Sequence, residues 1–464
     1  MKQKKVFTPF SIPVFAFLTV ILLGTLALWL LPGAQAQSVG FLDSLFTATS
    51  AVCVTGLSTI DPGAAFTRTG HAIILVLMQL GGLGIITYST MIIYLLGRQI
   101  SLTDKVAVSQ TLFYDSTFHP GRFAKRVVAV VLLLELGGMI CFLLVKPGDM
   151  DLFEAAFLSV SSFCNAGFTC WPDGIAKWKD SWLVCSVIML MIELGGIGFF
   201  VIDEVVRMVR KRIRWKDACP YRRHTGKPRQ RPRLTFQSRI VITTSVGLAI
   251  FGTCFFLLTG YFDPEWQHLG FGELLRVSMF QSVTCRTAGF AIIDVKAFSD
   301  IALLGMIFLM LIGGSPGSSA GGVKTTTFRV LVGYMKSQLT GRRQTMVGGK
   351  AVTEGTLNKA MQLFFFTVIT IVLATLVLTM TEIGFVRHDS TRLTFLDIFY
   401  EVVSAYGTVG LTVGVSAKLT MAGKAVLCCV MFIGRLGPIW LLTTIQRFSP
   451  ILHYKVPDVD LSIG

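Results

Sequence analysis

The chain has 464 residues, of which 53% are hydrophobic, and its mean hydropathy is +0.67. A soluble globular protein cannot cover so much apolar surface, so this composition excludes an ordinary soluble enzyme or binding domain. The net charge of +16 is unevenly placed, since 13 lysines and arginines lie between Arg207 and Arg239.

Long apolar segments alternate with short amphipathic ones in the same order four times. Each unit has a first apolar helix, a short helix that enters the membrane without crossing it, a glycine-containing loop and a second apolar helix. The helices are predicted at 11–32, 41–53 and 69–97; at 126–145, 151–163 and 181–209; at 239–260, 272–285 and 300–333; and at 361–384, 395–406 and 420–447. Since an apolar run of about 18 residues spans a bilayer, we expect an all-α polytopic membrane protein with eight spans and four half-spans.

These units define the predicted organisation of the chain. It consists of repeat 1 (1–97), repeat 2 (98–209), a basic cytoplasmic loop (210–238), repeat 3 (239–335), repeat 4 (336–447) and a cytoplasmic C-terminal tail (448–464). An even number of spans puts both termini on one side, and the lysine-rich and arginine-rich loops mark that side as cytoplasmic. We therefore interpret the basic loop as a contact for anionic lipid or for a partner protein, and a role in nucleic-acid binding is disfavoured.

The N-terminus also resembles a secretory signal, because basic residues at 2–5 precede an apolar stretch and Ala34-Gln35-Ala36. The apolar stretch, 12–31, is longer than the usual signal core of about 7–15 residues. Cleavage would also remove the first helix of the first unit. We therefore expect a retained helix.

The loop after each short helix repeats one pattern, with intervals of 111, 122 and 121 residues between its glycines. The four copies are Val54-Thr55-Gly56, Asn165-Ala166-Gly167, Thr287-Ala288-Gly289 and Thr408-Val409-Gly410. Inside a membrane, non-helical backbone is tolerated only where it lines a watery path or is buried in protein. Four such loops around one axis can form a ring of carbonyl oxygens that replaces the hydration shell of a cation. The repeat thus predicts pseudo-fourfold symmetry around one central pore.

Two further positions align the short helices. Ser50, Ser161 and Ser404 lie six residues before the loop glycine, where the third unit has Val283. Thirteen residues before the glycine, the first, second and fourth units have an acidic residue, whereas the third unit has Arg276. The acids are Asp43, Glu154 and Asp397. We expect them to cap helix N-termini, and an acidic vestibule that concentrates cations is the alternative left open.

The second helices contain another repeat, in which Gly81-Gly82 and Gly195-Gly196 correspond to Gly434-Arg435. Pairs of small residues allow helices to pack closely in membranes. Arg435 is different, because a charge within a membrane normally faces a cavity or a partner. We expect Arg435 below the loops, beside the permeation path, and consider Glu193 as its partner.

A glycine-rich and serine-rich run interrupts the second helix of the third unit. It comprises Gly313, Gly314, Ser315, Pro316, Gly317, Ser318, Ser319, Ala320, Gly321 and Gly322. Such a run cannot remain a regular helix, so we predict a mobile intramembrane loop that gates the pore. It is not a phosphate-binding loop, because Val323 separates Gly322 from Lys324 and no soluble strand precedes it.

With four such units, one glycine in each loop, the break in the third unit and the arginine in the fourth, the chain resembles the Trk/Ktr/HKT superfamily of potassium transporters. The resemblance extends over about 11–448 and is strongest to membrane pore subunits of the KtrB and TrkH type. Because no helix pair precedes the first unit, KtrB is the better match. Pro316 within the predicted gating loop departs from the family pattern.

The resemblance implies the roles of particular residues and partners. The residues before each loop glycine would supply filter carbonyls, and 313–322 would form the gate with Arg435 beside it. In plant relatives a serine at the first glycine accompanies sodium preference, so four glycines favour potassium. The resemblance also implies a homodimer in the inner membrane and a cytosolic nucleotide-binding regulatory subunit of the KtrA or TrkA type. By the same resemblance, potassium would be the transported ion; no cofactor is expected in this chain, and sodium stimulation is left open.

Two other functions fit the sequence less well. An alternating-access carrier for sodium and potassium remains the alternative, because a discontinuous helix fits that mechanism too. Carrier repeats are usually two and often inverted, whereas these four run in parallel. An enzyme is disfavoured, because the six histidines are scattered and no nucleophile–histidine–acid set is evident.

Overall fold

The computed structural model describes residues 12–83, 120–145, 150–172, 174–217, 234–266, 269–384 and 394–437. The described residues are mainly α-helical, with one antiparallel hairpin formed by β1 (Met346–Val347) and β2 (Lys350–Ala351). Parts of the predicted second helices of the first and fourth units, the centre of the basic loop and the C-terminal tail lie outside the described residues.

The first two units contain the following helices. The first unit has α1 (Ile12–Leu30), α2 (Phe41–Cys53), α3 (Pro62–Ala65) and α4 (Arg68–Gly82). The second unit has α7 (Pro120–Val145), α8 (Leu152–Cys164), η1 (Ala176–Trp178), α9 (Trp182–Ile197) and α10 (Phe199–Asp217). In each, the short helix, α2 or α8, ends directly before the glycine loop.

The last two units follow the same order. The third has α11 (Phe236–Phe262), η2 (Pro264–Trp266), α12 (Phe271–Thr284), η3 (Val295–Ala297), α13 (Asp300–Leu311) and α14 (Thr325–Leu339). The fourth has α15 (Glu354–Glu382), α16 (Phe395–Gly407), η5 (Ser416–Lys418) and α17 (Met421–Leu436). The irregular segment between α13 and α14 contains the glycine-rich run.

The predicted helix over 181–209 is wrong as a continuous element. It breaks at Gly198, and the helices on either side are bent by 100°. Gly198 has φ 100° and ψ 138°, a conformation that residues with a Cβ rarely adopt. A carbonyl of the glycine-rich segment, that of Pro316, also lies 2.8 Å from where a Cβ on Gly198 would be. Gly437 ends α17 in a similar conformation, with φ 78° and ψ 140°.

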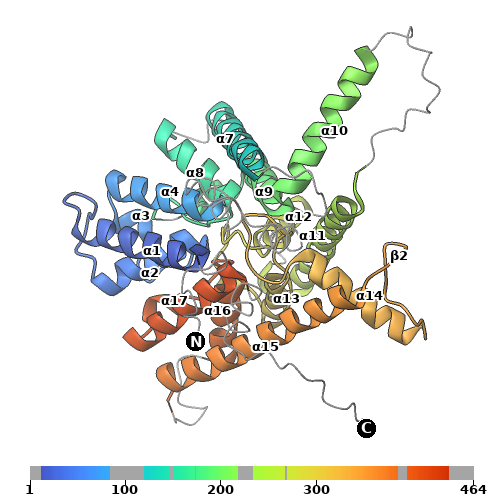
Figure 1. Cartoon of the computed structure of the whole chain (residues 1–464). Helices are drawn as coiled ribbons and strands as arrows, with labels where there is room; N and C mark the ends of the chain where they lie inside the picture. The colour runs from blue at the N-terminus through green and yellow to red at the C-terminus, as the bar shows by residue number, and fades with distance from the viewer. Residues whose placement is uncertain are drawn as a thin grey trace, which may run out of the picture.

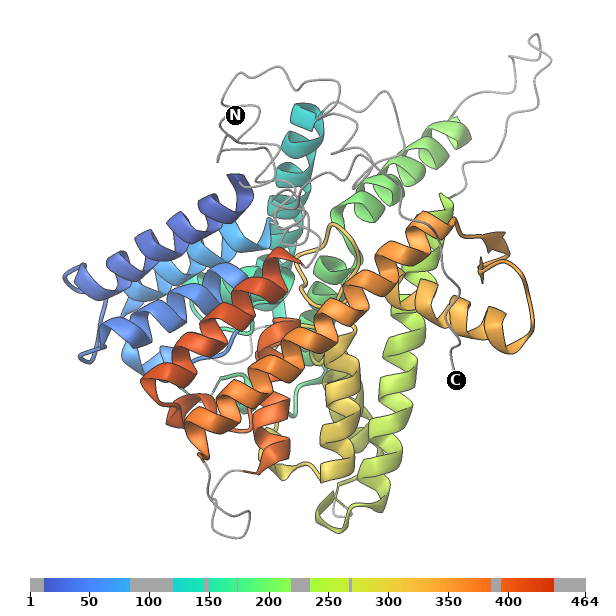
Figure 2. The same cartoon turned by 60° about the horizontal axis from the view of Figure 1, so that its bottom comes forward.

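Packing between the units closes on itself. The second helix of each unit contacts the short helix of the next: α4 contacts α8, α9 contacts α12, α13 contacts α16, and α17 contacts α2. Figure 1 shows α8, α12 and α16 toward the centre of the molecule, with the long helices α7 and α15 around them. In Figure 2, α15 (orange) crosses the face of the molecule toward the viewer, and α11 (yellow-green) lies toward the right side.

Burial separates the short helices from the long ones. Most of α2, α8, α12 and α16 is buried, whereas large apolar side chains on the outer helices are exposed, such as Leu133 on α7 at 68%. In water such exposure would be costly, but a lipid bilayer covers it. Among the described residues, α7, α11 and α15 are each long and apolar enough to cross a membrane, and α9 with α10 qualifies as one bent span.

Candidate functional site

The four glycine loops meet one another in cyclic order. Each loop glycine faces a backbone carbonyl oxygen of the next loop so closely that a Cβ would collide with it. Gly56 faces the oxygen of Ala166, Gly167 that of Ala288, Gly289 that of Val409, and Gly410 that of Thr55. The four carbonyls belong to equivalent residues, those directly before each glycine. Loops far apart in the sequence therefore come together as one closed ring.

Each loop has the same unusual backbone. The residue two before each glycine is in the left-handed region: Val54 at φ 56°, Asn165 at 61°, Thr287 at 71° and Thr408 at 50°. The glycines are also left-handed, with φ between 69° and 93°. A residue with a Cβ in this region costs about 1–3 kcal/mol and persists only where its surroundings hold it. The same departure from ordinary backbone angles thus recurs at equivalent positions of all four loops.

Backbone hydrogen bonds from the short helices hold these loops. The N–H of the residue before each glycine donates to a carbonyl one turn back in the helix, at N···O distances of 2.8 to 3.0 Å. The donors and acceptors are Thr55 and Ser50, Ala166 and Ser161, Ala288 and Thr284, and Val409 and Ser404. In the third unit the acceptor, Thr284, lies five residues before the loop glycine. The acceptors of the other three units lie six residues before theirs.

The predicted equivalence of Val283 with the three serines is therefore wrong by one residue. Thr284 takes the serine's place, since its hydroxyl donates to the carbonyl of Phe290 at 2.7 Å, just as Ser161 donates to Phe168 at 2.7 Å. In the first and fourth units the hydroxyls of Ser50 and Ser404 instead accept from the loop glycines at 3.0 and 3.2 Å. A side-chain hydroxyl thus braces every loop.

The acidic residues at the helix N-termini have two kinds of role. Glu154 and Asp397 complete capping boxes, as the capping interpretation predicts. Asp43 instead accepts from the hydroxyl of Thr59 at 2.6 Å and pairs with Lys424 of α17 at 2.6 Å. In the third unit α12 starts about one turn earlier, so Glu273 is the acidic residue of its first turn.

Arg276 is buried and lies in the N-terminal half of α12. Its guanidinium pairs with Asp180 at 3.3 Å and with Glu273 at 3.5 Å, and it donates to the carbonyl of Asp180 at 3.0 Å. Since the loops lie at the opposite end of this helix, Arg276 is not part of the ring.

The glycine-rich segment lies against the C-terminal turn of α9. Ser315 N–H donates to the carbonyl of Gly196 at 2.9 Å, and Ser319 N–H donates to that of Gly195 at 3.3 Å. The N–H of Gly313 donates to the carbonyl of Val323 at 2.9 Å, and the N–H of Val323 donates to that of Leu311 at 3.2 Å, which closes the base of the segment. The segment also meets the ring, because a Cβ on Gly321 would collide with the side chain of Thr408. The sequence predicts an interruption at this place, and the structure puts the interruption directly beside the fourth loop.

The glycine pairs of the second helices lie against the ends of the short helices. A Cβ on Gly81, Gly195 or Gly434 would collide with the carbonyl of Val52, Phe163 or Tyr406, respectively. This is the close packing that the small residues predict.

Arg435, the residue that replaces the second glycine, is buried and donates to the carbonyls of Ser319 and Gly81. It therefore lies beside the glycine-rich segment. Glu193, considered as its partner, pairs instead with Arg286 at 2.6 Å. The sequence interpretation overlooked Arg286, although an arginine beside a membrane-embedded loop was itself a signal of a buried charge.

Comparisons with known proteins agree on one family. The TrkH family, described as a cation transport protein, matches residues 2–450. The chain is 31% identical to the Ktr system potassium uptake protein B of Bacillus subtilis, over 99% of this chain and 97% of that protein. It is 30% identical to the potassium/sodium uptake protein NtpJ of Enterococcus hirae, over 100% and 99%.

A solved structure shows the same fold. The crystal structure of the potassium transporter TrkH from Vibrio parahaemolyticus matches with a TM-score of 0.72 and 19% identity, covering 97% of this chain and 87% of that chain.

Proposed function

We propose, on the premise that the chain belongs to the TrkH family of cation transport proteins, that it is the membrane pore subunit of a potassium uptake system. The observation that carries this proposal is the closed ring of four loops, in which each glycine faces a carbonyl oxygen of its neighbour. Carbonyl oxygens at such a ring can replace the water around potassium. The potassium uptake named for the relatives supports the same ion.

In this proposal the four units surround one pore with pseudo-fourfold symmetry, and their loops form its selectivity filter. The filter residues are Val54, Thr55, Gly56, Asn165, Ala166, Gly167, Thr287, Ala288, Gly289, Thr408, Val409 and Gly410. The strained left-handed residues support this assignment, because strain that the surroundings maintain is typical of functional sites. Smaller alkali ions bind less well if the braced loops cannot contract around them.

The gate is the segment between α13 and α14 together with Arg435. Its residues are Gly313, Gly314, Ser315, Pro316, Gly317, Ser318, Ser319, Gly321 and Gly322. Its contact with Thr408 supports a position directly under the filter, where a shift of the segment would open or close the path. The hydrogen bonds to Gly195 and Gly196 hold it in the present position.

The cellular setting follows from charge and from the relatives' names. The basic loop 210–238 and the tail 448–464 would lie in the cytoplasm with both termini, and the chain would sit in the inner membrane. The name "Ktr system" indicates more than one component, which supports a cytosolic nucleotide-binding regulatory subunit. We include a homodimer in this proposal. The repeat boundaries at 97, 209, 239, 335 and 447 are part of it as well.

An alternating-access carrier for sodium and potassium is the second candidate. The potassium/sodium uptake named for the Enterococcus hirae relative favours it, as do the two broken helices at Gly198 and at 312–324. A pore carries ions fast enough for single openings to be resolved, whereas a carrier does not.

Uptake of rubidium into vesicles that contain the purified protein tests the proposal. We expect uptake that potassium inhibits far more strongly than sodium does. Equal inhibition by both ions would contradict the filter assignment. Planar-bilayer recordings then separate the two mechanisms, since unitary currents support the pore and their absence, with uptake intact, supports the carrier.

A further inference from the structure

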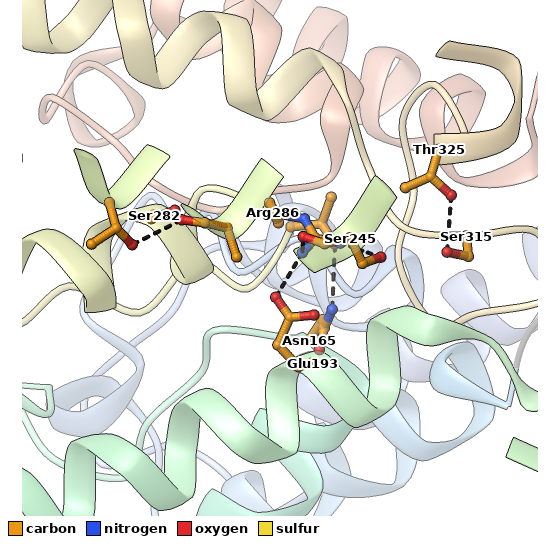
Figure 3. A network of polar contacts seen from close by, with 10 residues as sticks. Asn165, Glu193, Ser245, Ser282, Arg286, Ser315 and Thr325 are labelled. Atoms are coloured by element: carbon orange, nitrogen blue, oxygen red, sulfur yellow. Dashed lines mark hydrogen bonds and ion pairs between the residues drawn. The ribbon is translucent and has the colours of Figure 1, made fainter. Parts of the chain in front are cut away.

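Arg286 lies immediately before the third filter loop, and it is only 3% exposed. Its guanidinium pairs with Glu193 Oε1 on α9 at 2.6 Å, and it donates to the carbonyl and hydroxyl oxygens of Ser245 on α11 at 3.1 and 3.0 Å. Figure 3 shows Arg286 between Ser245 and Glu193. One side chain thus joins the third loop to helices of two units.

No other loop has a charge at this position. The equivalent residues, three before each glycine, are Cys53, Cys164 and Gly407. The guanidinium of Arg286, paired with Glu193, places a positive charge beside the third loop. Such a charge opposes the entry of a cation unless a nearby anion offsets it.

Glu193 supplies that anion, and it lies next to the residues of α9 that hold the gate segment. Its side chain is 26% exposed, against 3% for Arg286, so the carboxylate is the more open member of the pair. The helix turn that follows Glu193 contains Gly195 and Gly196, whose carbonyls hold Ser319 and Ser315. Filter loop, ion pair and gate segment are therefore connected through one turn of α9.

We propose that Arg286 is a positioning residue for the third filter loop and that Glu193 neutralises it, so that the loop gains a rigid anchor without repelling potassium. This inference rests on the proposed function. It makes two separable claims: the charge of Glu193 sets the rate of cation entry, and the contacts of Arg286 set the discrimination between potassium and sodium.

Rubidium uptake into vesicles by the variants Glu193→Gln and Arg286→Gln and by their combination tests both claims. Glu193→Gln leaves the guanidinium uncompensated and should lower rubidium uptake by about tenfold. Adding Arg286→Gln removes that charge and should return uptake to within about threefold of the unmodified protein. Arg286→Gln, alone or in the combination, should weaken the preference for potassium over sodium, because the anchor to Ser245 is lost. A conservative Glu193→Asp should retain most of the uptake.

Arg276→Gln is the matched control, because it removes a buried arginine with two acidic partners from α12, the helix that precedes the third loop. It should leave the ion preference unchanged. Normal uptake by Glu193→Gln would overturn the inference, as would a combined variant no more active than Glu193→Gln. An unchanged ion preference in Arg286→Gln would overturn the claim about anchoring.

The inference about Arg286 and Glu193 and the proposed function can be refuted independently of each other. If the unmodified protein carried no rubidium, the proposed function would be refuted, and the pair would still be tested by the melting temperature of the purified protein. Each single variant should melt lower than the unmodified protein, and the combined variant should recover part of the loss, because a buried charge without its partner is what destabilises. Losses that simply add would overturn the pairing.

Discussion

Arg435 of α17 donates to the backbone carbonyl of Ser319, in the segment between α13 and α14, and its other terminal nitrogen donates to the carbonyl of Gly81. The side chain thus connects the fourth unit with the third and the first. Arg435 occupies the position at which the second helices of the first and second units have Gly82 and Gly196.

We expect Arg435→Gln to raise potassium flux severalfold in the absence of any regulatory partner. Glutamine is too short to reach both carbonyls, so the segment loses a donor that holds it beside the fourth loop. Rubidium uptake into vesicles measures the effect. A normally folded variant with lower flux than the unmodified protein would contradict the proposed gate.

Gly56→Ser should weaken discrimination between potassium and sodium. Gly56 has φ +91°, and its Cβ would lie 2.5 Å from the carbonyl oxygen of Ala166, so the first and second loops must shift to accept a side chain. Sodium inhibition of rubidium uptake is the measurement. Gly33→Ser is the matched control, because Gly33 has φ +82° but nothing lies within 4 Å of its Cβ. An equal change in both variants would assign the effect to backbone strain in general.

Thr284→Val should destabilise the third loop by about 1–3 kcal/mol, because a buried carbonyl, that of Phe290, loses its hydroxyl donor. The melting temperature and the ion preference should both fall. Thr243→Val removes an exposed hydroxyl from α11, and we expect a loss within about 0.5 kcal/mol. If both variants behaved alike, Thr284 would not be the brace that replaces the serine of the other units.

Lys424→Met should lower the melting temperature, since the pair with Asp43 at 2.6 Å joins the first short helix to α17 and both side chains are largely buried. We expect a loss of about 1–2 kcal/mol. Arg68→Met provides the comparison, because the pair of Arg68 with Asp151 has a distance of 2.9 Å and is far more exposed. Its loss should be below about 0.5 kcal/mol. Similar melting temperatures would mean that the Asp43 pair adds little to closing the ring.

The sequence by itself determined the number and order of the units, the position of each glycine loop and the break in the third unit. These features follow from local requirements, because a bilayer demands long apolar helices and because glycine and serine runs cannot continue them. The tertiary structure alone decided three others: that Thr284 takes the place expected for Val283, that α9 ends at Gly198, and that Glu193 pairs with Arg286. A glycine such as Gly198 is equally typical of a closely packed helix and of a helix break, so the residue type alone did not predict the break. Glu193 and Arg286 lie 93 residues apart, so only the closure of four units into a ring determines which buried charges meet.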